Sequence, residues 1–192
     1  MKIIQQKEFS SILFDTLFGL ILFFGLDSFM DIHGLLPFIF YIFSTFILIH
    51  WWLVFKSADD AFSEEVTDSA VDLVFGIIYI ILIEYIILNA KLFSVAGATT
   101  YLIALLAVDL VWALAWRYVG NWNTTDRVKI KSMEKELNHN IRVNCVAIVV
   151  FGLLLTLAPA LSSAIYIATF IIFYILYVVA TFKTKIIDLR IF

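Results

Sequence analysis

The sequence predicts an all-α polytopic membrane protein with six transmembrane helices and both termini in the cytoplasm. Hydrophobic residues make up 63% of the 192-residue chain and charged residues only 15%, and the mean hydropathy is +1.01. A soluble domain of this size could not bury so much apolar surface, because its surface is too large for its volume. The bilayer must therefore be the solvent. Since little chain remains outside it, we expect residues 1–192 to form a single transmembrane domain.

Six apolar stretches are long enough to cross a bilayer, whose hydrocarbon core takes about 20 helical residues. We place these spans at 11–30, 35–55, 71–91, 97–118, 142–160 and 163–182. Pro159 interrupts the fifth span close to its end. Most connections are short, which makes sequential helices antiparallel neighbours.

The basic residues orient the chain, because Lys and Arg gather on the cytoplasmic side of a membrane. With six spans, every Lys and Arg except Lys91 falls on the side that holds the two termini. That side is therefore predicted to be cytoplasmic, and the protein to lie in a bacterial or archaeal inner (plasma) membrane.

Several function classes find no support in the chain. It has no hydrolase elbow, phosphate loop or zinc-protease motif, so we do not expect an enzyme. Its single cysteine, Cys145, excludes an internal disulfide and a cysteine-rich metal site, and we expect it to be a packing residue of the fifth span. No cofactor and no nucleic-acid partner are expected.

Carboxylates within the apolar stretches are the main functional candidates, because a charge in hydrocarbon is costly unless it meets protein, water or a cation. They are Asp15, Asp72, Glu84 and Asp109. Glu84 and Asp109 are predicted at similar mid-membrane depth, where both cannot be charged cheaply. Either one is protonated, or they share a cation, or each bonds separately to Tyr, Ser or Thr side chains.

A second pair is predicted nearer the cytoplasmic side. Asp15 in the first span and His50 in the second lie at comparable depth on neighbouring helices. A carboxylate–imidazole pair there could position a helix or titrate near neutral pH. The alternative is that His50 is an interfacial residue beside two tryptophans, Trp51 and Trp52, which with Trp116 we place in an aromatic girdle at headgroup depth.

The first span carries a face of small and polar residues at helical spacing. Its members are Ser11, Asp15, Gly19, Leu22 and Gly25. Such a face suits either close helix packing or a water-lined path. Asp27 and Asp31, at the outer end, would concentrate cations at a mouth.

Two cytoplasmic segments are long enough to contact a partner. Segment 57–70 is acidic and holds Asp59, Asp60, Glu64 and Glu65. It is either a solvated cap before the third span or a docking site for a basic protein or a divalent ion.

Segment 121–142 carries an apolar stripe at three- and four-residue intervals, formed by Ile130, Met133, Leu137 and Ile141. We expect this helix to continue into the fifth span. The stripe packs on the protein's own inner face, lies on the lipid surface, or pairs between subunits.

Three short motifs resemble the small prokaryotic members of the lysosomal-type potassium-leak channel family, which have six spans. Leu13 to Leu20 is similar to the start of that family's first helix, with Asp15 and Phe18 in matching places. The ending Trp116-Arg117-Tyr118 and the pair His50-Trp51 are also similar. The resemblance implies a tetramer whose first helices line a potassium path, with Leu20 and Phe24 at the constriction.

Three functions follow as hypotheses. The first is an oligomeric cation channel, potassium-permeable by resemblance, with the first helix lining the pore. The second is a membrane sensor or anchor that holds a soluble cytoplasmic partner through 57–70 and 121–142, as in a bacterial stress or defence complex. The third is a proton- or sodium-coupled carrier that uses Glu84 and Asp109.

Overall fold

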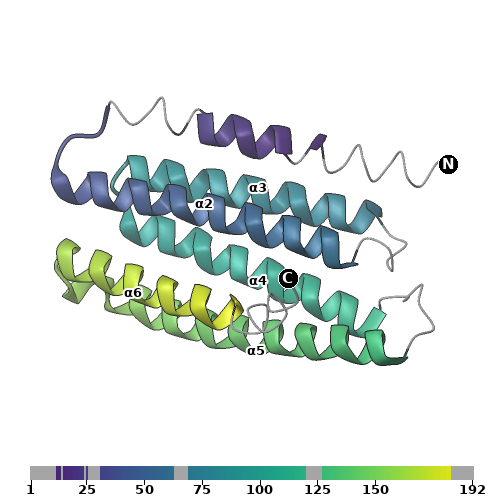
Figure 1. The fold of residues 1–192 in the computed structure, drawn as a ribbon. Coiled ribbons are helices and arrows are strands. Elements are labelled where there is room, and N and C mark those ends of the chain that lie inside the picture. The colour runs from purple at the N-terminus through teal and green to yellow at the C-terminus, as the bar shows by residue number, and fades with distance from the viewer. Residues whose placement is uncertain are drawn as a thin grey trace. The chain divides into compact units, whose positions relative to one another are not determined.

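The computed structural model describes residues 12–13, 15–23, 25, 31–62, 69–119 and 127–182, which form helices joined by short turns (Figure 1). No strand occurs among these residues, and the all-α prediction is confirmed for them. The long helices are α2 (Leu35–Phe62), α3 (Ser69–Lys91), α4 (Val95–Val119), α5 (Arg127–Leu157) and α6 (Ser163–Phe182).

Five of the described helices are long and apolar enough to cross a membrane. Their candidate spans are Leu35–Val54, Val74–Lys91, Val95–Tyr118, Ile130–Ala160 and Ser163–Thr181. They match five of the six predicted spans and indicate an integral membrane protein. Within the first predicted span, 12–13, 15–23 and 25 are helical, and 11, 14, 24 and 26–30 lie outside the described residues. The sixth crossing and the orientation of the termini therefore remain predictions.

Contacts between α-carbons divide the chain into two compact units, Met1–Leu102 and Ile103–Phe192, with the boundary inside α4. In the first unit, α2 packs against α3. Gly34 precedes α2 with a φ of 101°, a left-handed conformation that glycine adopts without strain. Its carbonyl oxygen accepts the first helical bond, from the Phe38 amide at 3.1 Å.

A second glycine, Gly97, lies close to the turn from α3 to α4. The Ser94 amide donates to the Asn89 carbonyl oxygen at 2.7 Å. A Cβ atom at Gly97 would lie only 2.0 Å from the Asn89 side-chain oxygen, so no larger residue fits there without movement. Beyond this close approach, the rings of Tyr85 and Tyr101 stack with centroids 4.8 Å apart and join α3 to α4.

The second unit is built on α5 and α6, which pack against each other. The 3-10 turn η2 (Ala158–Ala160) separates them and contains Pro159, which cannot continue the α-helical hydrogen bonding. The predicted interruption of the fifth span is therefore confirmed. Phe151 and Phe170 contact each other in this unit with ring centroids 5.5 Å apart.

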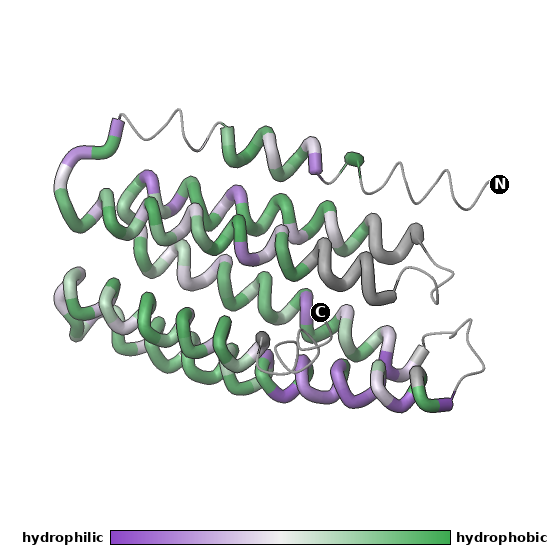
Figure 2. Tube along the Cα trace, viewed as in Figure 1, coloured by the Kyte–Doolittle hydropathy of each residue, from purple (hydrophilic) through white to green (hydrophobic). Residues whose placement is uncertain are grey.

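The amphipathic segment and the fifth span form one continuous helix, α5, as predicted. Figure 2 shows hydrophilic residues gathered in its N-terminal half. On that half Met133 and Leu137 are buried, so the stripe packs on the protein itself, the first of the three alternatives.

Trp51 and Trp116 are buried at 3% and 8% exposure, so each lies on a helix face that packs against protein, and their place at headgroup depth stays a prediction. One packing expectation is wrong. Cys145 is exposed, whereas its neighbour Asn144 takes the buried position.

Candidate functional site

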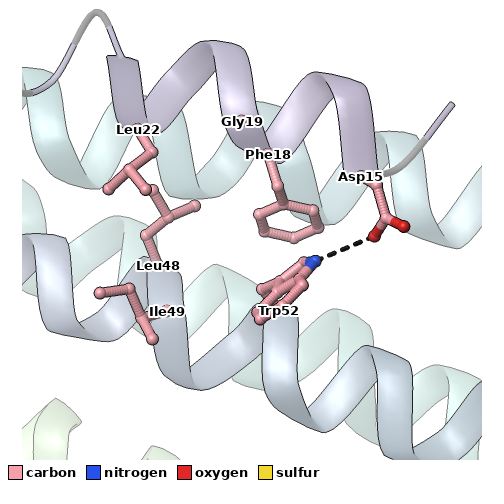
Figure 3. Close-up of a pocket in the computed structure, with 7 residues that line it drawn as sticks. All are labelled: Asp15, Phe18, Gly19, Leu22, Leu48, Ile49 and Trp52. Atoms are coloured by element: carbon pink, nitrogen blue, oxygen red, sulfur yellow. Dashed lines mark hydrogen bonds between the residues drawn. The ribbon is translucent and has the colours of Figure 1, made fainter. Parts of the chain in front are cut away.

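The candidate residues fall into two groups, one in each unit. In the first unit, Trp52 on α2 donates its indole N–H to Asp15 Oδ1 at 3.1 Å (Figure 3). This bond fixes the N-terminal segment to α2 at the level of the carboxylate, yet Asp15 itself stays exposed. Trp52 is thus a partner of Asp15 that the sequence did not single out.

His50 is buried at 7% exposure, and its ring meets that of Trp51 edge-on at 6.0 Å. The burial of His50 is set by neighbouring side chains and does not fix its depth in a membrane, so the interfacial alternative stays a prediction. The Asp15–His50 pair stays a prediction as well.

The small-residue face of the first span lies against α2. Asp15, Gly19 and Leu22 line a half-open cavity together with Phe18, and the opposite wall comes from α2. At its other end the Tyr41 hydroxyl donates to the carbonyl oxygen of the buried Gly25. Leu20, a predicted constriction residue, points elsewhere and is 46% exposed.

In the second unit, Asp109 is the centre of a buried polar cluster that joins three helices. Its exposure is 5%, and its Oδ2 atom accepts from the Asn144 amide at 2.5 Å and from the Asn140 amide at 3.3 Å, both on α5. Tyr177 on α6 donates its hydroxyl to Asn144 Oδ1 at 3.2 Å. We call Asp109, Asn140, Asn144 and Tyr177 the Asp109 cluster.

Two donors to Asp109 are of a kind that was not expected. The sequence-based hypothesis named Tyr, Ser or Thr side chains, whereas the two donors on α5 are asparagine amides. Asn140 and Asn144 are four residues apart and so share one helix face. That spacing in a largely apolar helix is the signal by which the sequence could have identified them.

Glu84 has a different environment. It is exposed on α3 within the candidate span Val74–Lys91, and it forms no hydrogen bond or ion pair with another described residue. It belongs to the first unit and Asp109 to the second. Joint use of the two carboxylates by a carrier stays a prediction.

Two ion pairs lie near helix ends among the described residues, one exposed and one partly buried. Lys91 pairs with Asp31 at 3.5 Å in the first unit. In the second unit Arg117 pairs with Glu134 at 3.1 Å and also donates to Asn138 at 3.3 Å, which ties the end of α4 to α5. Ion pairs within reach of solvent contribute about 1 kcal/mol or less each, so we assign both to positioning.

Several predicted residues cannot be placed in a site. Phe24, Asp27, Glu64 and Glu65 lie outside the described residues. Asp59, Asp60 and Asp72 lie within α2 or α3 by backbone alone, without a described side chain. Among the side chains that the structure describes, no group of three His, Cys, Asp or Glu residues could hold a metal ion.

No protein-family model, curated protein or solved structure matches the chain.

Proposed function

We propose that the chain is the subunit of an oligomeric cation channel, with the first helix lining the path and with potassium as the conducted ion by resemblance. The observation that carries this proposal is the exposed carboxylate of Asp15 on an apolar helical segment. A charge that faces lipid costs up to about 3 kcal/mol, whereas one beside water or a cation does not.

The neighbouring residues support a polar path. Thr16 is exposed next to Asp15 and lies four residues before Leu20, so it shares with Leu20 a helix face that does not line the cavity against α2. Further along the same segment, Leu20 and Phe23 are exposed at 46% and 66%. In an oligomer, a circle of negative side chains would attract cations, and a circle of apolar side chains after it would narrow the ion path.

The exposure of Glu84 supports an oligomer. Its neighbours on α3, Ile81 and Leu88, are each 46% exposed, so the carboxylate lies on an otherwise apolar surface. An ionisable residue inside a membrane almost always faces protein or a water-filled cavity. A second copy of the chain would provide that cover.

Ion flux through the purified protein tests the channel. The chain is reconstituted in liposomes that hold a potassium gradient, and flux is compared with that of protein-free liposomes. Replacement of a constriction side chain by a smaller one widens the path, so Leu20→Ala and Phe24→Ala should each raise potassium conductance several-fold. Leu53→Ala, on α2 with 47% exposure, is the matched control and should leave conductance unchanged.

Two results would contradict the channel. One is a potassium flux that neither Leu20→Ala nor Phe24→Ala alters. The other is a chain that remains monomeric in nanodiscs, as measured by light scattering, because a first helix cannot enclose a central path in a single copy.

A second candidate, the membrane anchor, is favoured by one surface. The exposed side chains of Arg127, Lys131, Lys135 and Arg142 follow α5 and form a basic face. If that face holds an acidic cytoplasmic protein, Lys131→Glu with Lys135→Glu should abolish co-purification of that protein. Lys91→Glu, a charge reversal predicted to lie on the opposite side of the membrane, should preserve it.

A further inference from the structure

We propose that the cavity between the N-terminal helical segment and α2 binds a small alkylated ammonium cation. The cavity is half-open, measures about 170 Å³, and is lined by Asp15, Phe18, Gly19, Leu22, Leu48, Ile49 and Trp52. All seven residues belong to the first unit. Binding there requires neither an oligomer nor ion conduction, so it is independent of the channel function.

One end of the cavity supplies a negative charge and two aromatic rings. Figure 3 shows Asp15, Phe18 and Trp52 at this end, with the indole N–H directed at the carboxylate. Donation to a carboxylate polarises the indole and makes its ring a better partner for a cation. A carboxylate beside aromatic rings is the combination that proteins use to bind quaternary ammonium groups.

The other end is apolar. Leu22, Leu48 and Ile49 gather there (Figure 3), and they would contact the alkyl part of the ligand. Gly19 leaves room between the two ends, since a Cβ atom at this position would meet nothing within 4 Å. A cavity of about 150 Å³ holds a benzene-sized molecule, so a trimethylammonium group fits.

The same lining disfavours other ligands. Hard metal ions take about six oxygen ligands, whereas Asp15 provides the only side-chain oxygens among the seven lining residues. An anion in the cavity would be repelled by the carboxylate of Asp15. A neutral apolar molecule would contact only the apolar end, whereas a ligand with both a positive charge and alkyl groups contacts both ends.

Competition on the unaltered protein tests this selectivity. Binding of radiolabelled choline to the full chain in nanodiscs of anionic lipid is measured, and unlabelled choline is compared with 3,3-dimethylbutan-1-ol, its neutral isostere. Choline should displace the label at least roughly tenfold more effectively, because only it carries the charge. Equal displacement by the two compounds, or no saturable choline binding, overturns the proposal.

A second experiment removes the negative charge of Asp15. In Asp15→Asn the amide oxygen can still accept from Trp52, so the shape is kept while choline affinity should fall roughly tenfold. Asp31→Asn, which removes an exposed carboxylate elsewhere in the same unit, should leave affinity unchanged. Equal affinities of Asp15→Asn and the unaltered chain contradict the role of the carboxylate.

A third experiment fills the cavity without changing any charge. Gly19→Leu places a side chain into open space and also favours helix, so the protein should fold while choline binding is lost. Gly152→Leu, on α5 in the second unit, likewise meets nothing within 4 Å and should bind choline normally. Normal binding by Gly19→Leu would place the ligand elsewhere.

The ammonium group can come from a free solute or from a choline lipid, and a final comparison separates the two sources. The labelled choline assay is repeated in nanodiscs that contain phosphatidylcholine in place of part of the anionic lipid. Weaker apparent binding identifies the lipid headgroup as a competing ligand, and unchanged binding identifies a free cation. Both results support an ammonium site.

Discussion

At the scale of single residues, Asp109 shows how a carboxylate is accommodated inside an apolar bundle. Two amides on α5 donate to one of its oxygen atoms, and one of those amides accepts in turn from Tyr177 on α6. Buried polar groups are tolerated when they are hydrogen-bonded in this way. The sequence identified Asp109 because a carboxylate within a span is unusual, but its donors depend on which helix faces meet, and no local pattern specifies that.

Removal of the shorter of the two hydrogen bonds from asparagine amides to Asp109 should destabilise the second unit. Asn144→Ala takes away the donor 2.5 Å from Asp109 and the acceptor for Tyr177. We expect a loss of about 1–2 kcal/mol in the free energy of unfolding, measured by denaturant unfolding of the purified protein in detergent.

The matched control for this change is Asn138→Ala, on the same helix. Asn138 is exposed and accepts only from Arg117, at 3.3 Å, among the contacts that the structure gives it. Its loss should cost less than about 0.5 kcal/mol. Equal losses in the two variants would mean that the Asp109 cluster adds nothing to stability.

At the scale of elements, hydropathy located five helices but not all of their ends. The second span was predicted to end at residue 55, whereas α2 continues to Phe62. Residues 56–62 are mostly polar, so they can be helical without being part of a membrane span. Conversely, Pro159 marked the end of α5 correctly, because a proline disrupts the hydrogen bonding of an α-helix whatever surrounds it.

The N-terminal half of α5 should depend on its buried stripe. Leu137 is 2% exposed, so Leu137→Ala removes buried methyl groups and leaves a cavity, at a cost of about 2–4 kcal/mol. Val128→Ala, at a position 78% exposed on the same half, should change stability by less than about 0.5 kcal/mol. Hydrogen exchange over 127–141 measures the effect, and unchanged protection in Leu137→Ala would contradict packing of the stripe on the protein.

At the scale of the whole molecule, the membrane class followed from composition, because only helices that satisfy their own backbone can cross hydrocarbon in such a chain. The candidate sites followed only in part. Asp15 and Asp109 were both identified, yet one lies exposed at a cavity and the other buried among amides. That difference arises from the partners that each helix face meets, and for Glu84 the partner is predicted to be another molecule.

The orientation of the molecule is a prediction that cysteine labelling can decide. Lys and Arg are held on the cytoplasmic side during insertion, and every one except Lys91 is predicted to lie on the side of the termini. The exposed His33, in the turn before α2, should then face outward, and the exposed Lys135 on α5 should face the cytoplasm.

Cys145→Ser gives a background without cysteine, into which His33→Cys or Lys135→Cys is introduced. A membrane-impermeant maleimide should label His33→Cys in intact cells and Lys135→Cys only after lysis. The reverse pattern would mean that the protein has the opposite orientation, with the basic face of α5 outside the cell, where no cytoplasmic partner could reach it. Equal labelling of both positions in intact cells would contradict the odd number of membrane crossings predicted between them.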